Sequence, residues 1–81
     1  MYNRLKPTKE TFLSQLLACD LDYMDGSARD IYIRYCSWCV RKKTEPDFAA
    51  LSHKVDADRL EELEIAWEWM RDVLLLREGQ L

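Results

Sequence analysis

The sequence contains few residues that interrupt regular structure, with two glycines and two prolines among 81 positions. Because glycine and proline mark most turns, this scarcity favours a few long helices over many short strands. Long apolar runs are also missing, since none exceeds the four residues from Val73 to Leu76, whereas a membrane-spanning helix needs about 20. The first residues lack the apolar stretch of a signal peptide, so we expect a cytoplasmic protein with no membrane segment.

A basic excess is absent as well. Twelve Lys and Arg against 15 Asp and Glu give a net charge of −3, which argues against a dedicated nucleic-acid-binding protein. The sequence has 48% hydrophobic and 33% charged residues, a composition typical of a folded globular domain. A chain of this length forms one domain at most, and a second copy or a partner would add to its small margin of stability. We therefore expect a single domain over residues 1–81.

The spacing of the apolar residues predicts an all-α protein, because no segment alternates apolar and polar residues as a strand would. Apolar residues instead recur three and four positions apart, as they do on one face of a helix. We predict a compact bundle of three long helices plus one short helix. The predicted helices span about 7–23, 28–43, 46–53 and 57–77.

Residues that favour helix ends support these limits. Ser27 and Asp30 have the spacing of a capping box for the second helix. Thr44 is expected to cap the third helix and Asp56 the fourth. Asp20 would lie among apolar residues if the first helix continued to position 23, where a carboxylate needs a partner. We therefore favour a first helix that ends a few residues earlier and leaves Asp20 solvated.

Two predicted helices have apolar arcs of roughly 220°, far wider than the arc of about 100° that a bundle helix needs. The second helix can be explained as the central helix of the bundle, covered on most sides. A chain of 81 residues cannot also surround the fourth helix, so part of its apolar surface should be exposed. Its main stripe, expected to face the core, is Leu60, Leu63, Ala66, Trp67, Met70, Val73 and Leu74. A second stripe beside it is Ile65, Trp69 and Leu76.

An exposed apolar stripe that contains a tryptophan is typical of an association surface. The sequence therefore predicts a small non-enzymatic protein-binding module, an adaptor or inhibitor of a larger protein, acting as a homodimer. Small acidic helical proteins of this kind are frequent in phages and mobile elements, and by that analogy alone we expect such an origin. The residues expected to contact the partner are Ile65, Trp69, Asp72, Leu76 and, from the second helix, Trp38.

A basic run closes the second helix and supports an alternative function. Arg41, Lys42 and Lys43 could contact phosphates, and the connection to the third helix could be a degenerate helix-turn-helix of a transcriptional regulator. The same run is also typical of a solvated helix end, where basic residues interact favourably with the helix dipole.

The cysteines allow a zinc site, although we favour their interpretation as small buried thiols. Cys36 and Cys39 form a C-x-x-C pair, and Cys19 with His53 would complete a set of four ligands. Zinc-binding pairs usually lie in a turn, whereas this pair lies within a predicted helix. No catalytic motif occurs in the sequence, so we predict neither an enzyme nor a cofactor.

Overall fold

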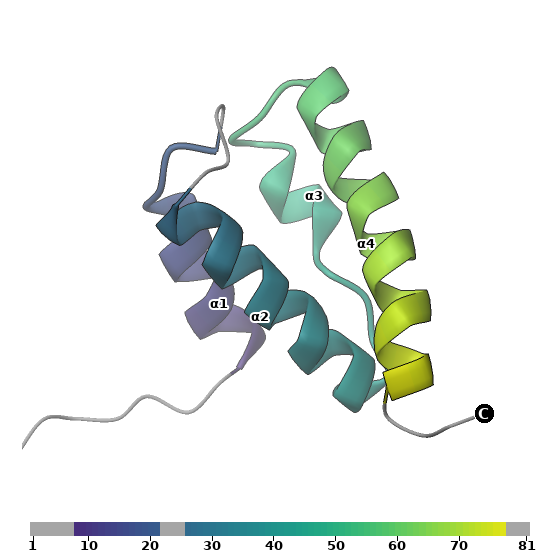
Figure 1. Cartoon of the computed structure of the whole chain (residues 1–81). Helices are drawn as coiled ribbons and strands as arrows, with labels where there is room; N and C mark the ends of the chain where they lie inside the picture. The colour runs from purple at the N-terminus through teal and green to yellow at the C-terminus, as the bar shows by residue number, and fades with distance from the viewer. Residues whose placement is uncertain (1–7, 22–25, 78–81) are drawn as a thin grey trace, which may run out of the picture.

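The computed structural model describes residues 8–21 and 26–77, and these residues form helices and no strands. The four helices are α1 (Lys9–Leu17), α2 (Ser27–Lys42), α3 (Phe48–Leu51) and α4 (Ala57–Arg77). Helix α2 packs against α1 on one side and α4 on the other, while the short α3 contacts both α1 and α4 (Figure 1). The predicted all-α class with four helices is confirmed, although α1 is only nine residues long.

Helix α1 is shorter than the range 7–23, and it ends where the favoured alternative placed it. Thr8 caps its start through a reciprocal pair of bonds: the Thr11 amide donates to Thr8 Oγ1 and the Thr8 amide donates to Thr11 Oγ1. Its last helical residue is Leu17, and Asp20 lies beyond it with an exposed side chain. Leu21 is only 1% exposed. The helix ends before it, and Leu21 packs into the core from outside α1.

Helix α2 has Gly26 as its N-cap, and the predicted capping box is wrong. Gly26 occupies the N-cap position with φ of 57°, a left-handed conformation that glycine adopts at little cost, and no side chain caps this end. Ser27 is therefore already helical. Asp30 instead pairs with Arg34 one turn later, at 3.0 Å.

The link between α2 and α3 also differs from the predicted one. Lys43 takes a left-handed conformation (φ of 58°) and the Thr44 amide donates to the Cys39 carbonyl, so Thr44 closes α2 and does not cap α3. Asp47 is the cap of α3, because its Oδ1 accepts the Ala50 amide at 3.1 Å. Helix α3 consequently covers only Phe48–Leu51 of the predicted range 46–53.

Helix α4 matches its predicted limits. Asp56 Oδ1 accepts the Arg59 amide at 2.9 Å, as expected of an N-cap.

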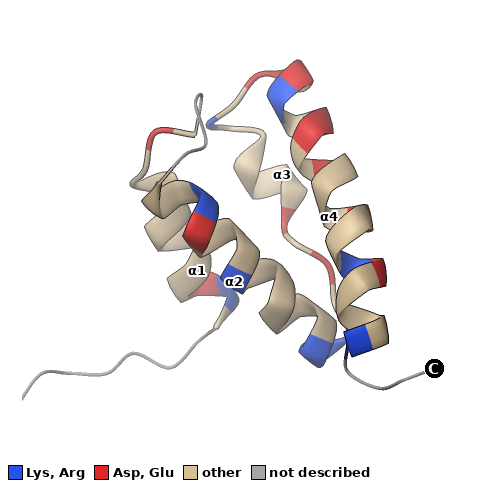
Figure 2. Ribbon diagram, viewed as in Figure 1, with Lys and Arg blue, Asp and Glu red and all other residues tan. Residues whose placement is uncertain are grey.

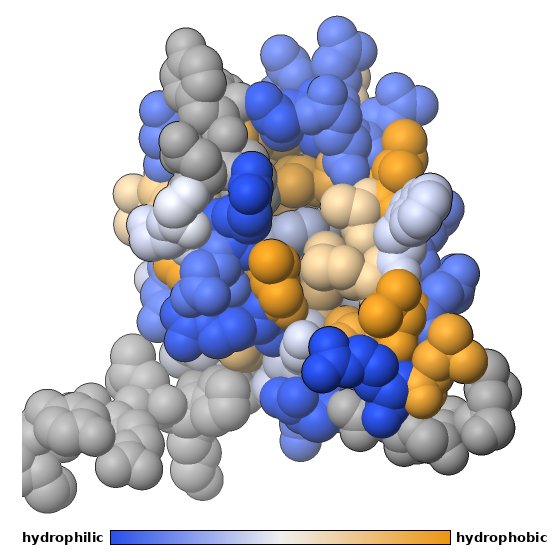
Figure 3. Space-filling model, in the orientation of Figure 1, coloured by the Kyte–Doolittle hydropathy of each residue, from blue (hydrophilic) through white to orange (hydrophobic). Residues whose placement is uncertain are grey.

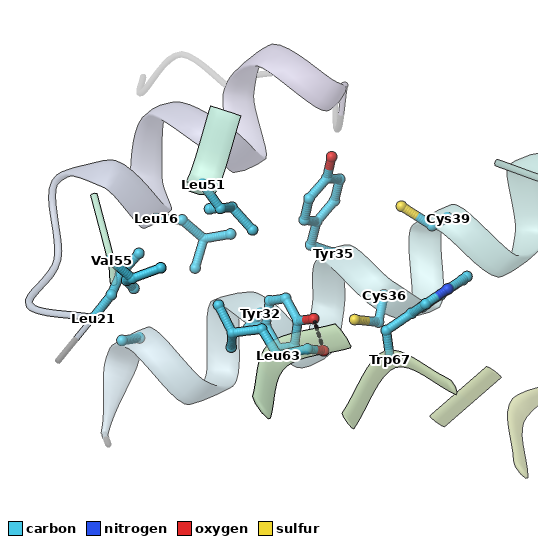
Figure 4. Close-up of a cluster of buried hydrophobic side chains, with 11 residues drawn as sticks. Leu16, Leu21, Tyr32, Tyr35, Cys36, Cys39, Leu51, Val55, Leu63 and Trp67 are labelled. Atoms are coloured by element: carbon cyan, nitrogen blue, oxygen red, sulfur yellow. Dashed lines mark hydrogen bonds between the residues drawn. The ribbon is translucent and has the colours of Figure 1, made fainter. Parts of the chain in front are cut away.

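The core lies around α2 (Figure 4). Helix α2 supplies Ala28, Tyr32, Tyr35, Cys36 and Cys39 to it, whereas the longer α4 supplies only Leu63 and Trp67. Two tyrosine hydroxyls tie α2 to its neighbours: Tyr32 donates to the Leu63 carbonyl at 2.6 Å, and Tyr35 accepts the Asp47 amide at 3.0 Å. Among the described residues, the other side chains of the hydrophobic core are Leu16, Leu21, Leu51 and Val55.

Candidate protein-binding surface

Helix α4 presents an apolar face that no described element covers. Trp67 is 4% exposed, while Trp69, two positions later, is 73% exposed. Ile65 and Leu76 are 50% and 58% exposed, so the stripe predicted to lie outside the core does so. Val73 is 49% exposed, which corrects its predicted place in the core-facing stripe. It lies at the edge of that stripe, about 40° around the helix from Trp69, where the neighbouring helices no longer reach.

We call Ile65, Trp69, Val73 and Leu76 the α4 stripe. Its residues recur at four-residue and three-residue steps over more than half of the helix, so they form one continuous face. Asp72 lies at the border of this face with its side chain 73% exposed, and its carboxylate is 3.6 Å from the guanidinium of Arg71.

An open groove of about 460 Å³ adjoins the stripe, between α2 and α4. Its floor includes the buried Tyr32 and Leu63, and Trp69 belongs to both the groove and the stripe. Figure 3 shows apolar surface in this depression and beside it, bordered by hydrophilic residues. The remaining lining residues are Arg29, Ile33, Arg59, Glu62, Ala66 and Met70.

Ile33, like Val73, belongs to this surface although the sequence did not predict it there. It is 43% exposed at the edge of the groove. We attributed the wide apolar arc of α2, which includes Ile33, to a central position in the bundle. Among the described residues, however, α2 is packed mainly by α1 and α4, and the side that carries Ile33 stays partly open. The same angular reasoning that identified Trp69 could have found it.

Trp38 lies apart from the α4 stripe. Its ring is 5.8 Å from that of Phe12 in α1 and 6.1 Å from that of Tyr35, so it faces the α1 side of α2. The ring is only partly exposed, and it packs against the core. The structure therefore does not bring Trp38 together with Trp69, as a shared partner surface would require.

Charge is distributed unevenly along the molecule (Figure 2). Arg41 and Lys42 lie in the last turn of α2 and Lys43 follows as its C-cap, all three exposed. Acidic residues cluster on the first half of α4, whereas Arg71 and Arg77 lie in its second half. The C-terminal ends of α2 and α4, at the bottom of Figure 2, thus form a basic pole.

The four residues of the possible zinc set do not form a site. Cys36 and Cys39 are fully buried in the core, and burial raises the pKa of their thiols to about 12 and about 11. The Cys19 thiol donates to the Gln15 carbonyl at 3.3 Å, and His53 is exposed. Among the described residues, no three such side chains are grouped so that they could hold a metal ion.

Known proteins give no further indication of function. No protein-family model, curated protein or solved structure matches the chain. Among the described helices, none combines the length and the apolar character that crossing a bilayer requires. Evidence about function comes from the α4 stripe and the adjoining groove.

Proposed function

We propose that the protein is a small non-enzymatic protein-binding module, an adaptor or inhibitor of a larger protein, which acts in the cytoplasm through the α4 stripe. The exposure of Trp69 supports this proposal most directly. Tryptophan is among the residues that contribute most to binding energy, and it does so when a partner excludes water from it. Trp67 on the same helix is buried in the core, whereas Trp69 is exposed to solvent.

The surroundings of Trp69 fit the usual composition of an interface. The stripe supplies an apolar centre, and the groove beside it extends this centre to Ile33 and Met70. Charged residues border it, with Arg29 exposed and Arg59 paired to Glu62. Charged groups at such a rim favour one orientation of the partner over others more than they add affinity.

A double variant, Ile65→Glu with Trp69→Glu, tests the proposal. Both positions are at least half exposed, so the fold should persist while two carboxylates block the stripe. Light scattering of the purified protein and of its complexes reports their mass. We expect the variant to have the mass of a single chain and to bind no partner. The matched control is Ser14→Glu with Gln15→Glu, which adds the same charge at exposed positions of α1. A folded stripe variant with unchanged mass and unchanged partner binding would refute the proposal.

The exposed basic pole supports a second candidate function, a nucleic-acid-binding regulator that contacts phosphates through Arg41, Lys42 and Lys43. The net charge of −3 opposes it. Retention on heparin or duplex DNA at low salt, lost as salt rises, would support this function. Absence of retention at low salt would eliminate it.

A further inference from the structure

We propose that the occupant of the α4 stripe is a second copy of this chain, with the two α4 helices antiparallel and crossing at Trp69. This inference rests on the proposed function, because it names the partner of the same surface. It also specifies an orientation that a protein-binding surface alone does not imply. Three features of α4 support it: the spacing of the stripe, the distribution of charge along the helix, and the area left uncovered.

The stripe is nearly symmetric about Trp69. Ile65 lies four positions before it and Val73 four positions after it. A twofold axis that passes between two facing Trp69 side chains therefore places Ile65 of one copy against Val73 of the other. Ile65 and Val73 then meet on both sides of the axis, as a self-complementary interface requires, whereas Leu76 lies opposite Glu62 of the other copy.

Charge along α4 favours the antiparallel orientation over the parallel one. Positions 57–68 contain five acidic residues and one arginine, a net charge of −4, whereas positions 69–77 contain two arginines and one aspartate, a net charge of +1. An antiparallel pair brings each acidic half near the basic half of the other copy. Glu62 and Arg77, seven positions before and eight after Trp69, lie on the same flank and would approach one another across the axis. A parallel pair would align the two acidic halves, which is unfavourable.

The uncovered area fits a dimer of ordinary size. A full aromatic side chain has about 150 to 250 Å² of surface and an aliphatic one somewhat less, so the exposed fractions of the four stripe residues leave roughly 450 Å² uncovered in each copy. A standard interface covers about 800 Å² on each partner, of which somewhat more than half is apolar. The stripe with its charged border therefore supplies the apolar share that such an interface needs.

Disulfide cross-linking distinguishes the two orientations. In a Cys19→Ser background, Ile65→Cys chains and Val73→Cys chains of different mass are mixed and oxidised. The antiparallel dimer places position 65 opposite position 73, so the mixed disulfide should form. Two copies of position 65 would lie about 12 Å apart along the helices, at about 1.5 Å for each of eight residues, and this exceeds the reach of a disulfide. Circular dichroism checks that both half-exposed substitutions leave the helices intact.

Each result has a defined meaning. A predominant mixed 65–73 disulfide in a protein whose mass equals two chains supports the proposal. Predominant 65–65 and 73–73 products indicate parallel helices and overturn it. A monomeric wild type that binds a different protein through Trp69 overturns the second copy as partner but leaves the proposed function standing. A dimer that Trp69→Glu does not weaken places the interface elsewhere, and the proposed function of the stripe then fails as well.

Discussion

Trp67 and Trp69 offer a matched pair of substitutions that separates folding from association. Both belong to α4, two positions apart, but one is 4% exposed and the other 73%. Trp67→Ala removes a ring packed in the core, and such changes lower the free energy of unfolding by about 3 to 5 kcal/mol. Because small domains have a total of only about 5 to 15 kcal/mol, we expect a large fall in stability.

Trp69→Ala should change the stability of the isolated chain by no more than about 0.5 kcal/mol, because the ring is already in water. Its effect should appear in association. The exposed part of the ring is roughly 180 Å², which at about 25 cal/mol per Å² sets an upper limit near 4.5 kcal/mol for its burial. A hot-spot loss of about 2 kcal/mol from each copy would raise the dissociation constant of a dimer roughly a thousandfold.

Two measurements on each variant test this pair. Urea unfolding at protein concentrations low enough to favour the single chain reports the free energy of unfolding. Sedimentation equilibrium over a concentration series reports the dissociation constant. We expect Trp67→Ala to shift mainly the first quantity and Trp69→Ala mainly the second. The reasoning is refuted if Trp69→Ala destabilises the single chain as much as Trp67→Ala does, or if it leaves association unchanged.

Three further predictions concern the core. Tyr32→Phe removes the hydroxyl that donates to the Leu63 carbonyl. The free energy of unfolding should fall by about 1 kcal/mol and the melting temperature by about 4 to 8 °C. An unchanged melting curve would show that this bond does not stabilise the contact of α2 with α4. At pH 8, Cys19 should react with iodoacetamide well before Cys36 and Cys39, which mass spectrometry can follow, because only the latter two are fully buried. Equal rates at all three thiols would contradict the burial. Burial also raises the pKa of Cys36 from 9.0 to about 12 and that of Cys39 from 9.0 to about 11. The unfolded chain therefore releases these protons first, and stability should be complete below pH 9 and fall as the pH rises from 9 towards 12. A urea midpoint constant from pH 8 to 11 would contradict this.

The sequence predicted which helices exist because apolar spacing and a scarcity of turn residues act locally. The start of α4 could be predicted because Asp56, a residue that favours the N-cap position, directly precedes a long segment with helical apolar spacing. Other ends could not, because several residues near each end can act as caps. Thr44 and Asp47 are both suitable caps for α3, and contacts with α2 decide between them. The Thr44 amide donates to the Cys39 carbonyl at the end of α2, and the Asp47 amide donates to the hydroxyl of Tyr35.

The exposed surface could be predicted only in part, and the errors share a cause. Periodicity indicates which residues share a face, but not how far a neighbouring helix extends over it. Val73 and Ile33 both lie at the edges of apolar arcs, and both are exposed because the packed helices cover only the centres of those arcs. Trp38 shows the opposite error, since it packs against the rings of Phe12 and Tyr35 and is only partly exposed.

Helices α2 and α4 have similar apolar arcs but very different burial, and this contrast links the fold to the proposed association. Helix α2 lies between α1 and α4 and contributes five buried side chains. Helix α4 packs on α2 and α3 with its core-facing side and contributes two buried side chains. No described element packs on its other apolar face. In the proposed dimer, α4 of a second copy covers this face, because it has the same length and the same apolar spacing, whereas α1 and α3 are shorter and α2 is already packed.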